Sequence, residues 1–253
     1  MKITFLGTGT STGVPHIGCT DAVCLSENNK DKRLRSAISI ETENENFLID
    51  CGPDFRQQLL KNPIDNITAI LFTHEHADHI GGLDDLRTIC HKQGAIPIYA
   101  HQRVLEALKK RYDYIFATEN RYKGAAKVIS NTIENKPFFI NKQEITPIDV
   151  LHGNWQVFGY RFDDFAYVTD VSFINTTEQE KLKGLKVLVL DALRIAPHPT
   201  HFCLAEALTL IAKLKPERAY LTHISYKLGF HDEIEKQLPK NVFLAYDNLI
   251  INI

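Results

Sequence analysis

Short apolar runs rich in β-branched residues alternate with helical stretches along the chain. Runs this short, bounded by Gly, Pro, Asn and Asp, favour strands over buried helices. Helical spacing of apolar residues appears at Val104, Leu105, Leu108 and Tyr112, and again from Leu204 to Leu214. The predicted strands are Ile3–Leu6, Ala37–Ile40, Asn46–Ile49, Ala69–Phe72, Pro97–Tyr99, Ile145–Leu151, Gln156–Arg161, Phe165–Val168, Lys186–Leu190, Arg218–Leu221, Val242–Ala245 and Leu249–Ile251.

The order of these elements predicts two sheets packed face to face with helices on the outside. Strands dominate the first third, the middle is mixed, and the last third alternates strand and helix. No internal repeat or flexible linker divides the chain, so we expect one domain over residues 1–253. Residues 113–144 are polar and weakly periodic, and we expect them to cross the surface. A functional lid and an inert connection are both open alternatives for this segment.

Composition narrows the functional classes. Hydrophobic residues make up 44% of the chain and charged residues 24%, which is typical of a globular protein. A net charge of -2 argues against a dedicated nucleic-acid or membrane-surface binder. No apolar run reaches the roughly 20 residues that span a bilayer, and the apolar run in MKITFLGTGT is too short for a secretory signal. We therefore expect a cytoplasmic protein whose five cysteines are reduced thiols.

The segment AILFTHEHADHIGG carries the strongest chemical signal. It places His74, His76, Asp78 and His79 in an H-x-H-x-D-H pattern directly after an apolar strand. His74 and His76 point the same way from extended backbone, whereas Asp78 and His79 follow the turn and address a second centre. We expect Gly81–Gly82 to free the backbone for the turn into a helix. Imidazole and carboxylate ligands at one strand end indicate a divalent-metal site.

Three other predicted strands also end in a side chain that can bind a metal. These side chains are His152, Asp170 and His223, and the last two follow Thr in the same way as His74 does. Each by itself is compatible with an ordinary loop residue. Because strand ends from two packed sheets collect at one rim, the four segments together favour a site with two metals.

These motifs together resemble the metallo-β-lactamase superfamily. The likeness spans the chain from LGTGTSTGVP and LIDCGPDFR through the His motif to AYVTD, PHPTHFCLAEAL, AYLTHIS and LAYDNL. The set is most similar to the PhnP-type branch, the phosphodiesterases related to the phosphoribosyl cyclic phosphate enzyme of phosphonate breakdown. The resemblance implies an α+β fold, a four-layer αββα sandwich with a dinuclear metal site at one edge of the two sheets.

The resemblance also implies a division of the metal ligands. One metal is held by His74, His76 and His152, the other by Asp78, His79 and His223, and Asp170 bridges both. All seven are N or O donors, so Mn²⁺ or Zn²⁺ comes first and Ni²⁺ or Fe²⁺ also fits. His76 stands where the iron oxidases of the superfamily carry Glu. Asp50 is either a partner that orients a ligand histidine or a structural turn residue.

Catalytic roles are assigned to His201 and Asp78. His201 matches the position of the family's general acid, and an imidazole near its ordinary pKa is suited to protonate a leaving group. His198 is the competitor, and helix capping is the structural alternative for His201. Arg194 either contacts a phosphate oxygen or is a surface arginine.

The sequence departs from its PhnP-type relatives at their structural zinc. Where they carry three Cys and one His, this chain has Cys19, Asp21, Cys24 and Tyr226. We therefore expect no structural zinc, and no disulfide between Cys19 and Cys24 in a reducing compartment. The basic run Lys30–Arg35 is interpreted as a solvated edge rather than a nucleic-acid contact.

The favoured function is a metal-dependent phosphodiesterase. It would hydrolyse a small phosphodiester, such as a cyclic ribose phosphate, through a hydroxide that bridges the metals, with His201 as general acid. The alternatives are a tRNase Z-like 3′ RNA endonuclease, a hydrolase of thioesters, lactones or β-lactams, and a non-catalytic binding module. We expect a small phosphodiester as partner, no membrane and no nucleic acid, and by family resemblance a homodimer.

Overall fold

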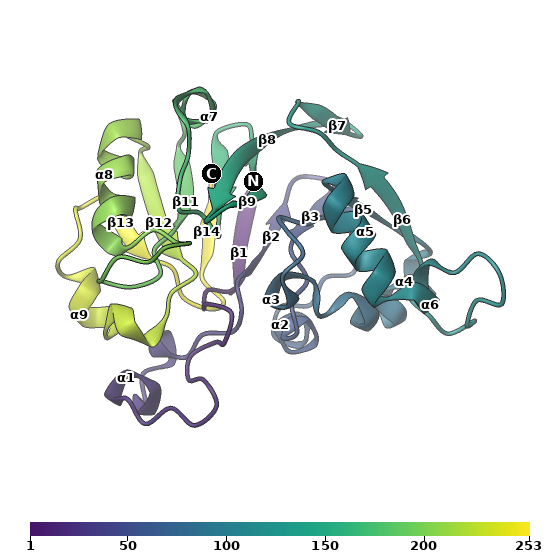
Figure 1. The fold of residues 1–253 in the computed structure, drawn as a ribbon, viewed down its shortest axis with the longest axis horizontal. Helices are drawn as coiled ribbons and strands as arrows, with labels where there is room; N and C mark the ends of the chain where they lie inside the picture. The colour runs from purple at the N-terminus through teal and green to yellow at the C-terminus, as the bar shows by residue number, and fades with distance from the viewer.

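A computed structural model describes residues 1–253. Two seven-stranded mixed sheets face each other, and helices cover the outer side of each (Figure 1). The first sheet has the order β14 (Ile250–Asn252), β1 (Lys2–Gly7), β2 (Ala37–Glu41), β3 (Asn46–Ile49), β4 (Ala69–Leu71), β5 (Ile96–Ala100) and β6 (Val128–Thr132). The second has the order β13 (Val242–Leu244), β12 (Arg218–Thr222), β11 (Val187–Asp191), β10 (Phe165–Val168), β9 (Trp155–Phe162), β8 (Gln143–His152) and β7 (Phe138–Ile140).

The helices form the two outer layers. The larger ones are α8 (Leu204–Leu214) on the second sheet, and α2 (Phe55–Lys61), α4 (Arg87–Gln93) and α5 (Gln102–Arg111) on the first (Figure 1). The shorter ones are α1 (Ala22–Leu25), α3 (Ala77–Ile80), α6 (Asp113–Phe116), α7 (Thr176–Glu180) and α9 (His231–Glu235), with 3₁₀ turns at Asn29–Asp31, Leu83–Leu86 and Tyr226–Leu228. The αββα fold expected from the resemblance is therefore confirmed.

Three apolar cores correspond to the three interfaces between layers. The middle core lies between the sheets and contains large side chains such as Phe5, Phe162 and Tyr167. One outer core joins the second sheet to α8, and the other joins the first sheet to α2, α4 and α5. Strands buried on both faces read as continuous apolar runs, which is why the sequence pattern located them.

All twelve predicted strands are present, but the segment 113–144 differs from its prediction. It contains α6 and two further strands, β6 and β7, which form edges of the two sheets as the chain passes from one sheet to the other (Figure 1). Edge strands are half exposed, with Ile129 and Phe139 open to solvent. Their apolar signal is therefore weak, which explains why they escaped the sequence analysis.

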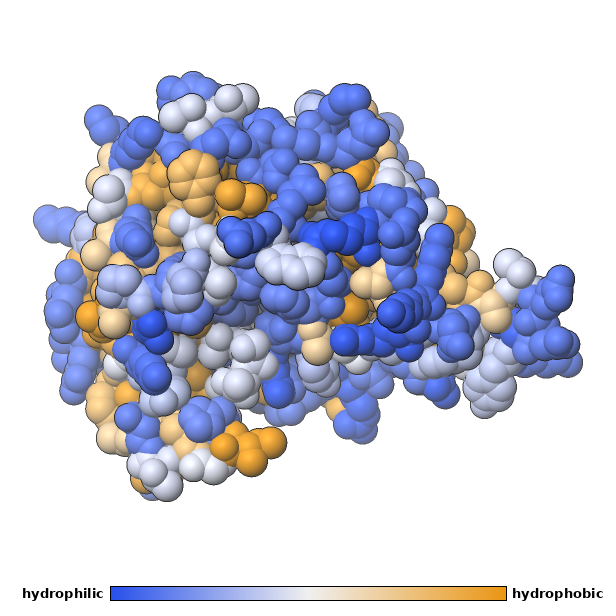
Figure 2. All heavy atoms as spheres, in the orientation of Figure 1, coloured by the Kyte–Doolittle hydropathy of each residue, from blue (hydrophilic) through white to orange (hydrophobic).

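The strands that precede the candidate site all run toward the same edge. β10, β11 and β12 are mutually parallel, β8 runs with them across the antiparallel β9, and β4 lies between the parallel β3 and β5. No helix combines the length and apolar character that crossing a bilayer requires. The face seen in Figure 2 is mainly hydrophilic, with small separate apolar groups.

Candidate metal centre

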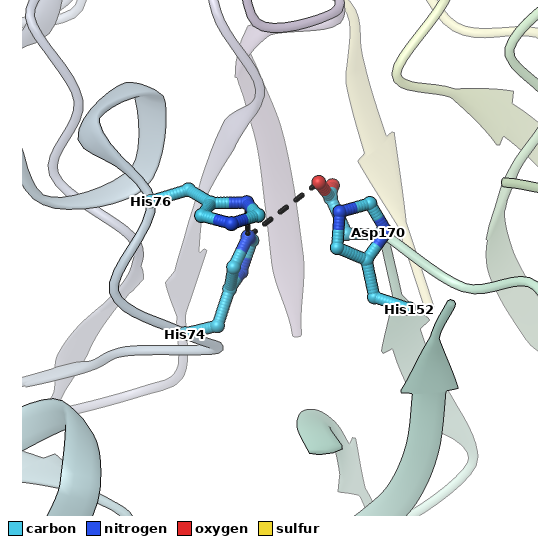
Figure 3. A group of neighbouring side chains, drawn as sticks. All are labelled: His74, His76, His152 and Asp170. Carbon is cyan, nitrogen blue, oxygen red and sulfur yellow. Dashed lines mark hydrogen bonds and ion pairs between the residues drawn. The ribbon is translucent and has the colours of Figure 1, made fainter. Parts of the chain in front are cut away.

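The seven predicted ligands meet at one edge of the two sheets. They form two groups that share Asp170, one of His74, His76, His152 and Asp170, the other of Asp78, His79, Asp170 and His223. The ligand atoms within each group lie within 4.8 Å of one another. Figure 3 shows the three imidazoles and the carboxylate of the first group directed at a common space. This division is the one that the resemblance implied.

Tight turns at the strand ends aim these side chains inward. Asp50, Asp170 and His223 each adopt a left-handed backbone, with φ of 66°, 59° and 57°. A non-glycine residue pays about 1 kcal/mol or more for this conformation. Backbone strain of this kind clusters at functional sites, where the turn places a side chain that a continuing strand could not.

The first group is partly open to solvent. His76 is exposed, whereas His74, His152 and Asp170 are buried. The His74 Nε2 atom lies 3.6 Å from Asp170 Oδ2 and 2.9 Å from His76 Nδ1. His152 Nδ1–H donates to the carbonyl oxygen of Thr200 at 2.7 Å, which leaves its Nε2 free as a ligand.

The second group is fully buried. His79 Nε2 lies 3.0 Å from Asp78 Oδ2, and His223 Nδ1 lies 3.0 Å from Asp170 Oδ1. On its other side, His79 Nδ1–H donates to Asp50 Oδ2 at 2.7 Å. Asp50 also accepts from the Thr73 backbone N–H and hydroxyl, so it both shapes the turn and orients His79.

Burial and crowding set the protonation of the cluster. Burial lowers the pKa of His74 well below its ordinary value and that of His223 to about 3. Burial alone would raise the pKa of Asp170, but the imidazoles of His223 and His79 hold it well below its usual range. Burial would lower the pKa of His79, but Asp170 and Asp78 reverse this and raise it. The cluster thus supplies ionised carboxylates and, at His74 and His223, neutral imidazoles, the forms that bind metals. The raised pKa of His79 favours its protonated form, and a cation that took the place of this proton would leave the His79 ring neutral as well.

The donor set fits a pair of divalent ions. His79 Nε2 and His223 Nδ1 are fully buried and have no hydrogen-bond partner, although each lies near a carboxylate oxygen. Buried nitrogens in that state are costly unless something at the centre uses their lone pairs. Two ions sharing the Asp170 carboxylate would use them, with four N or O ligands around each.

His201 lies against both groups of ligands. Its ring is 4.5 Å from that of His152 and 4.9 Å from that of His223, centroid to centroid. His201 Nδ1–H donates to Asp191 Oδ2 at 2.8 Å. Burial raises the pKa of Asp191 to about 6, and Asp191 in turn raises the pKa of His201 against the effect of burial. The pair is therefore a buried carboxylate–imidazole dyad at the edge of the sheets where the predicted metal ligands lie.

Asp191 is a residue of the site that the sequence patterns did not predict. It is the last residue of β11, directly after the apolar run VLVL. A search for strand ends that included carboxylates immediately after the apolar residues would have found it. Only the fold brings it to His201, ten residues further along the chain.

The surroundings of His201 exclude helix capping as its role. Helix α8 begins at Leu204 with Cys203 as its N-cap, so His201 does not cap this helix. His198 lies further from the ligands, with its ring 5.2 Å from that of His201. Arg194 donates to the carbonyls of Ala196 and Pro197, so two of its donors are used within its own loop, and its phosphate contact stays a prediction.

The glycines around the motif serve close packing rather than unusual backbone angles. Gly81 and Gly82 have ordinary negative φ values of -65° and -97°, contrary to the expected need for conformational freedom. A Cβ atom on Gly82 would lie 2.2 Å from the Gly52 carbonyl oxygen, and one on Gly52 would lie 2.0 Å from that of Asp78. The two loops touch through their backbones, and only glycine permits that contact.

Two expectations about the N-terminal region are wrong. Cys19 and Cys24 form a disulfide, so the chain has three free thiols rather than five. The turn of α1, capped by Asp21, carries Cys24 back to Cys19, a local proximity that reasoning from cellular compartment does not contain. The run Lys30–Arg35 is not simply a solvated edge, because Arg33 is buried and donates to Thr8, the Ala245 carbonyl and His231.

Comparison with known proteins bears on the fold and the family. Residues 45–224 match the family model described as the beta-lactamase superfamily domain. The crystal structure of a diphosphatase from the PhnP family is 40% identical, with a TM-score of 0.93, over 100% of this chain and 97% of that one. Zinc-bound PqqB from Methylobacterium extorquens has a TM-score of 0.80 at 17% identity, covering 100% of both chains, which shows the shared fold alone.

A sequence relative adds a longer protein to this comparison. An octanoyltransferase of Porphyromonas gingivalis is 39% identical over 253 residues, which are 98% of this chain and 51% of that protein. This chain thus spans about half the length of that relative. The resemblance found in the sequence is confirmed by the full-length match to the diphosphatase. The chain belongs to the metallo-β-lactamase superfamily and, within it, to the PhnP family.

Proposed function

We propose that this protein is a metal-dependent phosphodiesterase that hydrolyses a small phosphodiester. The observation that carries the proposal is the Asp191–His201 dyad, which lies against the seven candidate metal ligands. The ligand set by itself is common to hydrolases of many esters. A proton donor next to it is needed when the leaving group is a poor one, such as an alkoxide.

When bound, two divalent ions supply Lewis acidity toward a phosphoryl oxygen and lower the pKa of a water molecule. His74, His76 and His152 would hold one ion, Asp78, His79 and His223 the other, and Asp170 both. Burial opposes ionisation of Asp78, but His79 outweighs it and keeps the pKa of this carboxyl below its usual range. Asp78 would thus be an anionic ligand of the second ion, together with Asp170.

The dyad would deliver the proton to the leaving group. Asp191 accepts the His201 Nδ1–H and the Val171 backbone N–H through the same oxygen, so the imidazole is fixed in position. Its Nε2 is then the atom that can hold the transferable proton. Because Asp191 raises the pKa of His201, the imidazole holds that proton more firmly than a free histidine would, and the proton would pass to the more basic alkoxide.

A second candidate is the hydrolysis of a diphosphate. It is favoured by the 40% identical structure, which is described as a diphosphatase. A diphosphate releases a phosphate group, which is a far weaker base than an alkoxide and needs little help from a general acid. The dependence on His201 therefore separates the two candidates.

The decisive experiment strips the protein of metal and adds back Mn²⁺, Zn²⁺ or Ni²⁺. The substrates are a p-nitrophenyl phosphodiester, an alkyl phosphodiester and a diphosphate. We expect metal-dependent turnover of the diesters. We also expect His201→Ala to retain most activity on the p-nitrophenyl ester and to lose about a hundredfold or more on the alkyl ester. Asp191→Asn should lose less activity than His201→Ala, and its loss should again be greater on the alkyl ester than on the p-nitrophenyl ester.

Two outcomes contradict the proposal. Absence of diester turnover with two ions demonstrably bound would remove phosphodiesterase chemistry and favour thioester or lactone substrates. Turnover of the diphosphate alone, undiminished in His201→Ala, would support the second candidate. The expected homodimer is a separate prediction, which light scattering on the purified protein checks.

A further inference from the structure

Trp155 lies beside the first group of ligands. It is the first residue of β9 and pairs directly with His152 across the β8–β9 hairpin, whose turn contains Gly153 and Asn154. Directly opposed residues of an antiparallel pair project from the same face of the sheet. Trp155 therefore stands on the face from which His152 reaches the ligand cluster. The His152 ring is 5.2 Å from that of His76, the exposed ligand.

The indole is held on one side and open to solvent. The guanidinium of Arg103 lies over the ring, 5.1 Å from its centroid. Arg103 is fixed in turn by Glu75, between the first two histidines of the motif, and by the Gln156 carbonyl. The side chain of Trp155 nevertheless remains 54% exposed. A large aromatic ring that is fixed in place without being buried adds little to folding and is available to a ligand.

The neighbouring exposed side chains do not cover it. Leu151 and Phe173 are also exposed and meet through backbone hydrogen bonds. Leu151 precedes His152 in β8, so it projects from the opposite face of the sheet. Trp155 is therefore the exposed aromatic side chain of this hairpin that lies on the same face of the sheet as His152.

We propose that Trp155, braced by Arg103, is the stacking platform for a nucleobase of the substrate. This inference rests on the proposed function and names its substrate class, a small phosphodiester with a nucleoside on one side of the scissile phosphate. A nucleobase offers a planar π face of the size of an indole, and stacking on a fixed aromatic ring tolerates any base. The proximity of Trp155 to His152 sets the base next to the phosphate that the ligand cluster would hold.

The chain offers a direct optical test because Trp155 is its single tryptophan. Its fluorescence is recorded while metal-loaded protein is titrated with adenosine 5′-monophosphate or with ribose 5-phosphate, which has the same phosphate but no base. We expect the nucleotide to quench the emission and to bind about tenfold more tightly than the sugar phosphate. Equal affinities, or no quenching by the nucleotide, would overturn the proposal.

Variants extend the test to binding without a tryptophan signal. By calorimetry, Trp155→Ala should lose about tenfold in affinity for the nucleotide and nothing for ribose 5-phosphate, whereas Trp155→Phe should keep most of the affinity. Phe139→Ala, which removes another exposed aromatic ring on the distant β7, is the matched control and should change neither. A loss in Trp155→Ala that is equal for both ligands would indicate a structural role and overturn the platform.

Kinetics separates this inference from the proposed function. Thymidine 5′-p-nitrophenyl phosphate and methyl p-nitrophenyl phosphate share a leaving group, and Trp155→Ala should raise KM about tenfold for the first substrate alone. No turnover of either ester, with quenching by the nucleotide intact, would refute the diesterase and leave the platform standing. A short oligoribonucleotide that binds ten times more tightly than the mononucleotide would overturn the assignment to a small substrate, since the base would then belong to RNA.

Discussion

Two buried polar clusters lie on either side of the loop at Thr8. The backbone carbonyl of Thr8 accepts from Ile224, next to His223 of the ligand cluster, and its hydroxyl accepts from Arg33. The ligand cluster consists of the seven metal-binding candidates. The other, here called the Arg33 cluster, consists of Thr8, Asp31, Arg33, His231 and Asp247.

The two clusters differ in how well their polar groups are satisfied. In the Arg33 cluster, Arg33 donates to Thr8, to His231 Nδ1 and to a carbonyl, while Asp247 accepts from the Leu34 N–H and from Thr8. In the ligand cluster, His79 Nε2 and His223 Nδ1 have no hydrogen-bond partner. Because buried polar groups are normally paired, a self-satisfied cluster indicates a structural role and an unsatisfied one indicates a place for a ligand.

The strongest test of this difference is Asp170→Asn, since Asp170 belongs to both groups of ligands. The amide keeps the shape but loses the charge that both ions need. We expect activity to fall about a thousandfold or more and the bound metal to fall below two ions per chain, measured by kinetics and elemental analysis. Asp163→Asn, at another left-handed aspartate in the β9–β10 turn, is the control. Retention of two ions in Asp170→Asn would show that the ligand cluster does not act as a shared site.

The converse test is Arg33→Met, which should act on stability rather than on chemistry. Removing the guanidinium takes the hydrogen-bond donor from His231 and the neighbouring positive charge from the buried Asp247 carboxylate. We expect the free energy of unfolding to fall by about 3 kcal/mol. Urea denaturation of the metal-free protein measures it. Lys30→Met in the same run loses an exposed ion pair with Asp232 and a cation–π contact with Tyr246, and should cost less than about 1 kcal/mol. Equal losses in the two variants would remove the structural role of the Arg33 cluster.

A smaller effect should distinguish the two groups within the ligand cluster. Asp50 orients His79 of the second group, whereas His152 of the first is oriented by a backbone carbonyl. Asp50→Asn should therefore weaken one of the two ions by about 10- to 100-fold and leave the other unchanged. Calorimetric titration of metal into stripped protein resolves the two steps. Equal weakening of both ions would mean that the groups are coupled, through Asp170 or through the Thr73 hydroxyl, which lies 2.9 Å from Asp50 Oδ2 and 3.0 Å from His74 Nδ1.

The smallest expected effect is the pH dependence of stability from the Arg33 cluster. His231 Nδ1 accepts from Arg33, and burial together with that charge lowers the pKa of His231 to about 4. Between pH 6.5 and 4 the unfolded chain holds more protons than the folded one, so the stability contributed by His231 is present at pH 7 and is lost on acidification. At pH 5 the loss is roughly 1 to 2 kcal/mol.

His231→Gln isolates this contribution, because the amide can accept from Arg33 but does not titrate. Its free energy of unfolding should depend less on pH between 7 and 5 than that of the natural protein. Asp247, whose pKa burial raises to about 6, contributes the opposite slope in both proteins and cancels in the difference. Identical pH profiles would show that the pKa of His231 is not lowered by burial beside Arg33.

Sequence patterns predicted those parts of the site whose residues lie close together in the chain. His74, His76, Asp78 and His79 lie within six residues, and the apolar run before them reports the strand whose end they occupy. The edge strands β6 and β7 escaped because half-exposed strands carry mixed residues. Asp191 escaped because its partner His201 is brought to it only by the loop between β11 and α8.

The sequence by itself determined the buried strands, because a strand that is buried on both faces consists of a continuous apolar run. It also determined the order of the layers and the residue types available to a metal. The tertiary structure decided what these residues face. It gave Arg33 three buried hydrogen-bond acceptors, joined Cys19 to Cys24, left two ligand nitrogens without partners and set Trp155 opposite His152. The reason is that hydrogen bonding, burial and pKa depend on distances in space. These distances join segments far apart in the chain for Arg33 and the ligand nitrogens, and depend on the exact course of a turn for Cys19–Cys24 and His152–Trp155.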